Sequence, residues 1–221
     1  MQKSLALLVA TAVWGISLLF DAAGASAVSH VVCLDPGHGG DEPGAVRTKR
    51  GPNGFTLVEK EINLDVALHL RDRLELDGFV VVMTRDSDET VSLQERVDTC
   101  NGANADIAVS LHTNSTNSPR WDGAMTLMNK SADSELAETI QPMLYNGLSE
   151  SWDSRFTNYG INVDEWFFPK HTNMPAVILE PVFMSNRDEL PALRATIVQD
   201  DAGRRAEIVQ VEYEAIASYF D

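Results

Sequence analysis

Four residues of this 221-residue sequence are of the types that bind a metal ion or transfer a proton: His38, Glu59, His112 and Glu180. Two neutral imidazoles and one carboxylate form a common catalytic zinc site, in which water takes the fourth position and its pKa falls to about 7. A carboxylate that does not bind the metal can take the proton of that water and pass it to a leaving nitrogen. Together, such groups hydrolyse an amide bond.

Each candidate also has an ordinary structural explanation. A single His in a glycine-rich loop, such as His38, usually makes a loop hydrogen bond. A Glu in the first turn of a helix, as Glu59 would be, is favoured by the helix macrodipole, and a Glu at a strand end, such as Glu180, is often solvated. The functional interpretation therefore depends on the candidates lying together. His30 and His69 are expected to play no part, because one precedes the first strand and the other lies on a charged helix face.

The surrounding sequence predicts strands and helices in alternation. Short apolar runs bounded by Gly, Pro, Asn or Asp predict strands, at residues 31–34, 79–83, 107–111, 123–128 and 176–179. Helical spacing of apolar residues and capping signals predict helices, at 59–77, 92–101, 135–148 and 202–220. This alternation is typical of a single α/β domain with parallel crossover connections.

Some segments carry more specific predictions. The all-apolar run 79–83 should be an inner strand, and 39–54 should be irregular because it is rich in Gly and Pro. Pro142 should kink or shorten the helix that contains it. Residues 149–172 fit no element clearly.

The predicted elements place the candidates at one edge of the sheet. Open α/β sheets bind ligands at the carboxyl ends of their strands. His38, His112 and Glu180 each follow a predicted strand, and the helix that begins at Glu59 should start near the same edge. We therefore expect the four side chains to share one site.

Composition limits the classes of function. There are 17 Lys and Arg against 33 Asp and Glu, a net charge of −16, with 44% hydrophobic residues. Nucleic acids and anionic membrane surfaces need a basic protein surface, so neither is expected as a partner. Residues 1–27 resemble a cleavable secretory signal, with Lys3, an apolar run and a small-residue cleavage site. We expect a secreted or periplasmic catalytic domain over 28–221, with no membrane attachment after cleavage.

The two cysteines, Cys33 and Cys100, lie on a predicted buried strand and on an apolar helix face. Export would permit a disulfide. We prefer two buried free thiols, and neither cysteine has the neighbours of a metal site.

Taken together, these motifs resemble the zinc-dependent N-acetylmuramoyl-L-alanine amidases of bacterial cell walls, the Amidase_3 family. The similarity covers nearly all of the chain from Val31 to the last helix. It is carried by separate blocks in the family's order, at 35–40 (DPGHGG), 44–45 (GA), 59–64 (EKEINL), 84–86 (TRD), 92–96 (SLQER), 110–114 (SLHTN), 175–180 (PAVILE) and 183–186 (FMSN).

The resemblance implies one zinc ion held by His38, Glu59 and His112, with Glu180 as the catalytic glutamate. Asn63 and Asn114 match recurrent polar positions, and we expect them to support the ligands. The implied fold is a central mixed six-stranded sheet flanked by helices, like that of phosphorylases and hydrolases. Some family members carry a helix that blocks the site between the second His and the catalytic Glu. None is evident here, so an open site is expected.

The chain departs from the family pattern in three places. The loop before Glu59 is longer and carries the cations Arg47, Lys49 and Arg50, which either meet an anionic substrate or are simply solvated. Pro181 and Val182 stand where the family usually has Gly before the Phe. The segment 159–170 matches the family only loosely, so its substrate contacts do not transfer.

The implied activity is hydrolysis of the amide between N-acetylmuramic acid and L-alanine, with peptidoglycan as the partner and a possible activator protein unidentified. One alternative is a zinc carboxypeptidase or other peptide amidase on a similar fold. Another is a non-catalytic wall-binding module, against which the retention of all four candidates argues.

Overall fold

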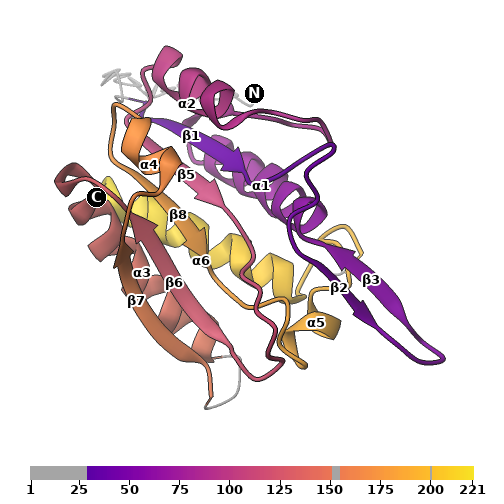
Figure 1. Ribbon diagram of the computed structural model, residues 1–221. Coiled ribbons are helices and arrows are strands. Elements are labelled where there is room, and N and C mark those ends of the chain that lie inside the picture. The colour runs from indigo at the N-terminus through magenta and orange to yellow at the C-terminus, as the bar shows by residue number, and fades with distance from the viewer. Residues whose placement is uncertain (1–28, 151–154, 200) are drawn as a thin grey trace, which may run out of the picture.

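The computed structural model describes residues 29–150, 155–199 and 201–221, and the expected signal segment 1–27 lies outside these ranges. Its centre is a six-stranded sheet in the order β4-β1-β5-β8-β6-β7 (Figure 1). The strands are β1 Val31–Pro36, β4 Val80–Met83, β5 Ile107–Leu111, β6 Gly123–Met128, β7 Thr157–Val163 and β8 Ala176–Glu180. Neighbours pair in parallel except β6 and β8, which are antiparallel. The predicted mixed six-stranded sheet is confirmed.

Helices cover both faces of the sheet. The long helices α1, α3 and α6 lie on one face and form the main core, while α2 and α4 lie on the other (Figure 1). The helices are α1 Glu59–Leu76, α2 Leu93–Gly102, α3 Ser134–Glu150, α4 Phe167–His171, α5 Glu189–Ala192 and α6 Arg204–Tyr219, with a 3-10 turn at Ser131–Asp133. Within the described ranges, no helix has the length and hydropathy to span a bilayer.

The run 79–83 does not form an inner strand, so that prediction is wrong. It forms β4, which lies at the edge of the sheet beside β1, and Val80 is 46% exposed. Both faces of β4 contact helices, α1 on one side and α2 on the other. The apolar run is explained by helices on both faces of β4. A strand can have both faces covered whether it lies inside the sheet or at its edge.

The glycine-rich loop is more regular than predicted. Part of it forms β2 (Val46–Lys49), which pairs with β3 (Phe55–Val58) in an antiparallel hairpin that extends from the body (Figure 1). The unassigned segment 149–172 supplies β7 and α4.

Pro142 does not shorten its helix. α3 runs for 17 residues through it. Pro142 and Glu138, whose carbonyl loses its amide partner, are both exposed, so water can satisfy that carbonyl.

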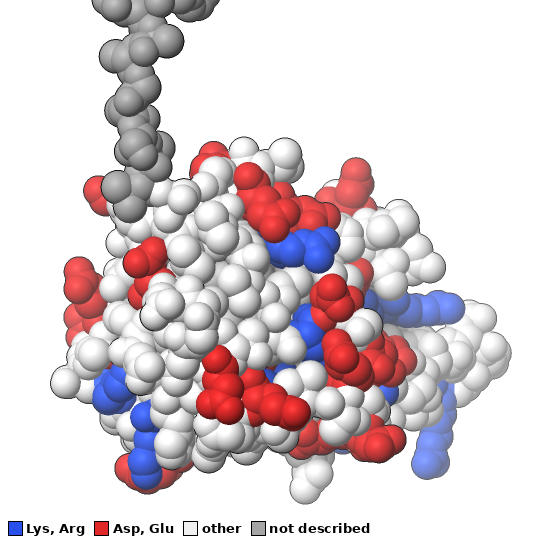
Figure 2. All heavy atoms as spheres, turned by 90° about the horizontal axis from the view of Figure 1, so that it is seen from above, with Lys and Arg blue, Asp and Glu red and all other residues white. Residues whose placement is uncertain are grey.

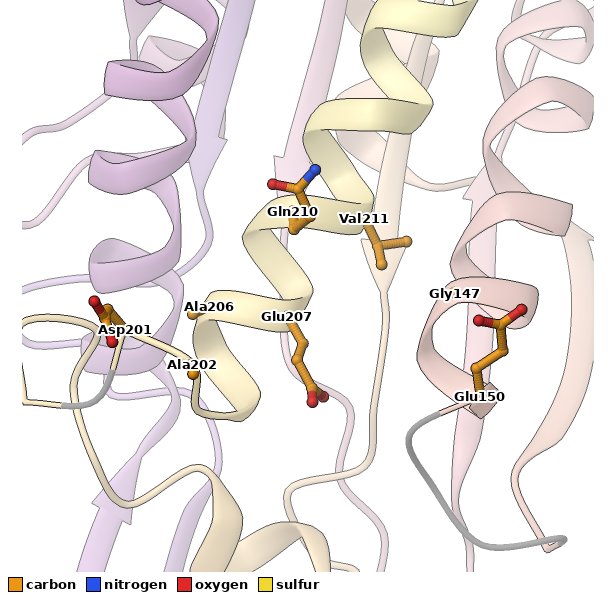
Figure 3. Close-up of a pocket in the computed structure, with 8 residues that line it drawn as sticks. All are labelled: Gly147, Glu150, Asp201, Ala202, Ala206, Glu207, Gln210 and Val211. Carbon is orange, nitrogen blue, oxygen red and sulfur yellow. The ribbon is translucent and has the colours of Figure 1, made fainter.

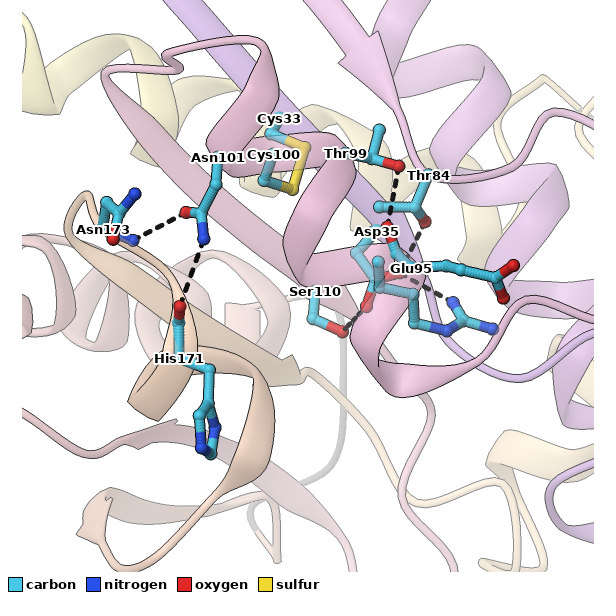
Figure 4. Close-up of a disulfide and its surroundings, with 11 residues drawn as sticks. Cys33, Asp35, Thr84, Glu95, Thr99, Cys100, Asn101, Ser110, His171 and Asn173 are labelled. Carbon is cyan, nitrogen blue, oxygen red and sulfur yellow. Dashed lines mark hydrogen bonds and ion pairs between the residues drawn. A yellow bond between two sulfur atoms is a disulfide. The ribbon is translucent and has the colours of Figure 1, made fainter.

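The preference for free thiols is also wrong, because Cys33 and Cys100 form a disulfide (Figure 4). It joins β1 to α2 with a Cα–Cα distance of 5.5 Å, inside the smaller core beneath α2 and α4. Both cysteine side chains lie between β1 and α2, among other buried apolar residues. Burial was predicted correctly, but the proximity of the two sulfurs depends on how α2 packs on the sheet.

Acidic side chains are spread over the face of the molecule seen in Figure 2. Asp and Glu side chains form several separate groups on the face seen in Figure 2 and no single acidic patch.

Candidate metal centre and active site

Three of the predicted residues meet at the carboxyl edge of the sheet. One ligand atom each from His38, Glu59 and His112 lies within 4.8 Å of the others. Oε1 of Glu59 is 3.3 Å from Nε2 of His38 and 3.0 Å from Nδ1 of His112. Bonds of about 2 Å to a tetrahedral ion separate ligand atoms by about 3.3 Å. The donor set and its spacing therefore fit a zinc ion.

Glu59 is positioned by its place at the start of α1. Its backbone amide donates to the carbonyl of Ala45, and its Oε2 accepts a 2.8 Å hydrogen bond from the amide of Ala45. Its Oε1 also faces the amide of Thr113 at 3.3 Å. Burial alone raises the pKa of Glu59, but hydrogen bonds with His112 and His38 outweigh it and hold the pKa well below its usual range. The carboxylate is thus kept ionised, as a metal ligand must be.

Asn63, one turn further along α1, supports this carboxylate. Its Nδ2 lies 3.4 Å from Oε1 of Glu59 and 3.3 Å from the carbonyl of Gly37, while its Oδ1 accepts from the Thr113 hydroxyl at 2.9 Å. Asn114 makes different contacts. Its side chain accepts from the amide of Ser115, and its backbone forms a bridge with Phe183.

The loop that carries His38 is held by two buried arginines. Arg85 donates to the carbonyls of Pro36 and Gly37 at 2.9 and 3.0 Å, and Arg96 donates to the carbonyl of His38 at 2.7 Å. The loop also passes very close to the second imidazole. A Cβ on Gly37 would lie 2.3 Å from the ring of His112, so only glycine fits there.

Asp35 links this loop to the sheet. Its carboxylate accepts from Arg96 at 2.7 Å, and from the hydroxyls of Thr84 and Ser110 at 2.6 Å each (Figure 4). Sequence reasoning placed Arg85 and Arg96 in matching motif blocks but gave them no role. Arg96, Val97 and Cys100 are the buried residues of α2. A charged residue on an apolar helix face indicates a buried partner, and this pattern could have identified Arg96 from the sequence.

Glu180 ends β8 and faces the same site. It lines a cavity of about 260 Å³ together with His38 and His112, and residues 166–168 form an aromatic wall from α4. Among the described residues, its buried Oε2 has no hydrogen-bond partner. Desolvation raises the pKa of Glu180 to about 7, although the charge of His112 opposes the shift. A carboxyl that titrates near neutrality can both accept and donate a proton.

The pKa of His112 is raised, because its hydrogen bond to Glu59 and the charge of Glu180 outweigh the opposing effect of burial. About a fifth of each imidazole side chain, 22% for His38 and 21% for His112, stays exposed to the cavity. α4 therefore forms a wall of the site and does not cover the histidines.

His69 and His30, which were expected to play no part, contact residues other than the candidate ligands. His69 bonds to a carbonyl of its own helix, and His30 stacks on Phe220. Arg47 donates to the carbonyl of Thr116 at 2.8 Å, which ties the hairpin to the loop after β5.

A second cavity, of about 490 Å³, lies between α3 and α6, the helices on the other face of the sheet (Figure 3). It is lined by Gly147, Glu150, Asp201, Ala202, Ala206, Glu207, Gln210 and Val211. None of the described residues that line it is a His or Cys, and none is a candidate metal ligand. The candidate residues His38, His112 and Glu180 line the cavity of about 260 Å³ instead.

The comparisons with known proteins agree with this geometry. Residues 32–207 match the Amidase_3 family, N-acetylmuramoyl-L-alanine amidase. The chain is 32% identical over 190 residues to the N-acetylmuramoyl-L-alanine amidase LytC of Bacillus subtilis, covering 84% of this chain and 36% of that protein. It is 30% identical over 206 residues to the germination-specific N-acetylmuramoyl-L-alanine amidase of the same organism, covering 86% of this chain and 79% of that protein.

The fold is similar to that of the catalytic domain of CwlV, an N-acetylmuramoyl-L-alanine amidase from Bacillus (Paenibacillus) polymyxa var. colistinus. The TM-score is 0.74 at 29% identity, and the match covers 87% of this chain and 98% of that domain. The matched segment contains all four candidate residues, since 32–207 includes His38, Glu59, His112 and Glu180. The chain therefore belongs to the Amidase_3 family of N-acetylmuramoyl-L-alanine amidases.

Proposed function

We propose that this protein hydrolyses the amide bond between N-acetylmuramic acid and L-alanine in peptidoglycan. The observation that carries the proposal is the convergence of His38, Glu59 and His112 within 4.8 Å, with Glu180 in the cavity beside them. Relatives of this fold are named for the same activity. We also place the protein outside the cytoplasm, as a catalytic domain over 28–221 preceded by a secretory signal.

His38, Glu59 and His112 would hold one zinc ion. When bound, zinc polarises a carbonyl and makes hydroxide available near neutral pH. The chain keeps these ligands fixed. Asn63 and Ala45 hold the Glu59 carboxylate, and Arg96 holds the loop of His38.

Glu180 is the proposed general base and acid. Its raised pKa, about 7, suits a group that takes a proton from water and returns it to the leaving nitrogen of L-alanine. The aromatic residues of α4 narrow the approach of bulk water to the cavity that Glu180 lines. Asn114 has no part in this proposal, because its side chain bonds to Ser115.

The test uses purified peptidoglycan and mass spectrometry of the released products. Glu180→Gln should keep zinc at the level of the unmodified protein and lose activity by about 10²–10⁴-fold, the usual contribution of a general acid–base. His112→Ala should lose both zinc and activity. His69→Ala serves as a control, because this histidine bonds only to its own helix.

The products also separate the alternatives. Free stem peptides beginning with L-alanine support the amidase, whereas cleavage between amino acids would indicate a carboxypeptidase. A protein that binds peptidoglycan but releases nothing with zinc bound would be the non-catalytic module. An active Glu180→Gln variant would remove Glu180 from the mechanism.

A further inference from the structure

A stacked pair of aromatic side chains lies on the surface near the proposed site. Trp121, in the loop between β5 and β6, is 51% exposed. Its ring stacks on Tyr159 of β7, with ring centroids 5.8 Å apart and planes inclined by 9°. Tyr159 in turn contacts Phe183 at 5.4 Å. One face of Trp121 is thus backed by tyrosine, while half of its surface remains available.

A β-bulge puts Tyr159 in this position. In the pairing of β6 with β7, Ala124 lies opposite Asn158 and Met125 opposite Gly160, so Tyr159 has no partner. Bulges are common beside active sites, where they redirect a side chain. Asn158 accepts a hydrogen bond from Gln141 of α3, so its side chain faces α3. Tyr159 contacts Trp121 and Phe183, which lie in the loops that follow β5 and β8, so its ring lies at the carboxyl edge of the sheet that also carries His112 and Glu180.

The strand register places the β7 backbone next to Tyr159 close to Glu180. Gly160 lies opposite Met125, and Met125 lies opposite Glu180. Two steps of about 4.8 Å between neighbouring strands separate these backbones by about 10 Å. A sugar ring that stacks on the aromatic pair would thus lie next to a sugar bound beside Glu180.

The loop that presents Trp121 is held in place. Asn186 donates to the carbonyl of Trp121 at 3.2 Å, and the amide of Arg187 donates to the carbonyl of Pro119 at 3.1 Å. A large aromatic ring on a fixed loop loses little conformational freedom when it binds a ligand. The exposed half of the Trp121 side chain contributes no hydrophobic free energy of burial, and a ligand that covers it would supply that free energy.

We propose that Trp121 and Tyr159 form a subsite that stacks on a pyranose ring of the glycan strand, next to the muramic acid whose amide is cleaved. The C–H face of a pyranose is apolar and slightly positive, which complements the negative face of an aromatic ring. This inference rests on the proposed amidase function, because that function makes the glycan strand the neighbour of the cleaved bond. Tyr159 backs the Trp121 ring, and Trp121 makes the sugar contact.

The first test measures binding without catalysis. Peptide-free glycan strands are titrated calorimetrically into the zinc-loaded protein. Trp121→Ala should weaken binding about tenfold, equivalent to about 1.4 kcal/mol, whereas Trp121→Phe should lose less. Tyr213→Ala is the matched control, since this tyrosine lies on α6 beneath Arg73. Equal affinities of Trp121→Ala and the unmodified protein would overturn the subsite.

The second test compares two substrates that differ in glycan length. For Trp121→Ala, the ratio of KM on glycan strands bearing stem peptides to KM on a single-sugar muramoyl peptide should rise about tenfold. A proportional loss on both substrates would show a structural effect and contradict the proposal. A protein that binds glycan through Trp121 but cleaves neither substrate would refute the amidase function and leave the subsite standing.

Discussion

Reduction of the Cys33–Cys100 disulfide should destabilise the protein substantially. The bond closes a loop with a sequence separation of 67 residues. The chain-entropy relation for a loop of this length gives about 4 kcal/mol at 25 °C. Domains have a total free energy of unfolding of about 5–15 kcal/mol, so the disulfide is a large part of it.

The assay is urea unfolding of oxidised protein and of protein refolded under reducing conditions. With a slope of about 2 kcal/mol/M, a loss of 4 kcal/mol lowers the midpoint by about 2 M urea. The double variant Cys33→Ala/Cys100→Ala is the control, because reductant should not move its midpoint. A shift below about 0.5 M on reduction would refute the reasoning.

The same perturbation should reach the metal centre. The disulfide attaches α2 to β1 (Figure 4). α2 also carries Arg96, which holds Asp35 and the carbonyl of His38. Reduced protein should therefore bind zinc more weakly, by about 10-fold, which is the effect expected when the groups around a ligand lose their order. Zinc affinity that is unchanged by reduction would show that Arg96 holds the loop without help from the disulfide.

Two further predictions concern single residues. Glu212 is buried on α6 with an unpartnered Oε2 among the described residues, and desolvation raises its pKa to about 8. The contribution of Glu212 to the free energy of unfolding is complete below the unfolded-state pKa of 4.5 and is lost as the pH rises to about 8. At high pH the free energy of unfolding of Glu212→Gln should therefore exceed that of the unmodified protein by up to about 5 kcal/mol. Parallel melting curves from pH 5 to 9 would contradict this. Gly44→Ala should lower zinc affinity at least about tenfold, because the φ of Gly44 is +66° and a Cβ there would lie 2.7 Å from Oε2 of Glu59. Gly51→Ala is the control for backbone strain alone, because Gly51 has a φ of +120° and open space around the Cβ position. Equal zinc affinities in the two variants would argue against the contact with Glu59.

Much of the site could be predicted from the sequence. The apolar runs before His38, His112 and Glu180 mark strands, and strand ends of an open α/β sheet meet at one edge. The helix start at Glu59 follows from its four-residue apolar spacing, which runs from Ile62 to Leu74. These signals are local, because each depends on residues within one element.

Other features could not be predicted, because a local pattern has two tertiary explanations. The apolar run 79–83 fits an inner strand or an edge strand covered on both faces, and the packing of α1 and α2 decided for the edge. A proline such as Pro142 is tolerated in a helix when the freed carbonyl faces water, and sequence alone does not show which way it faces.

The sequence by itself determined which side chains are the candidates for the chemistry and at which edge of the sheet they lie, because side-chain type and strand periodicity are local properties of the sequence. Only the tertiary structure decided what brings distant residues together. The pairing of Cys33 with Cys100, the support of His38 by Arg96, and the bulge that stacks Tyr159 on Trp121 all join separate elements. Such contacts depend on the packing and register of whole strands and helices, which no local pattern specifies.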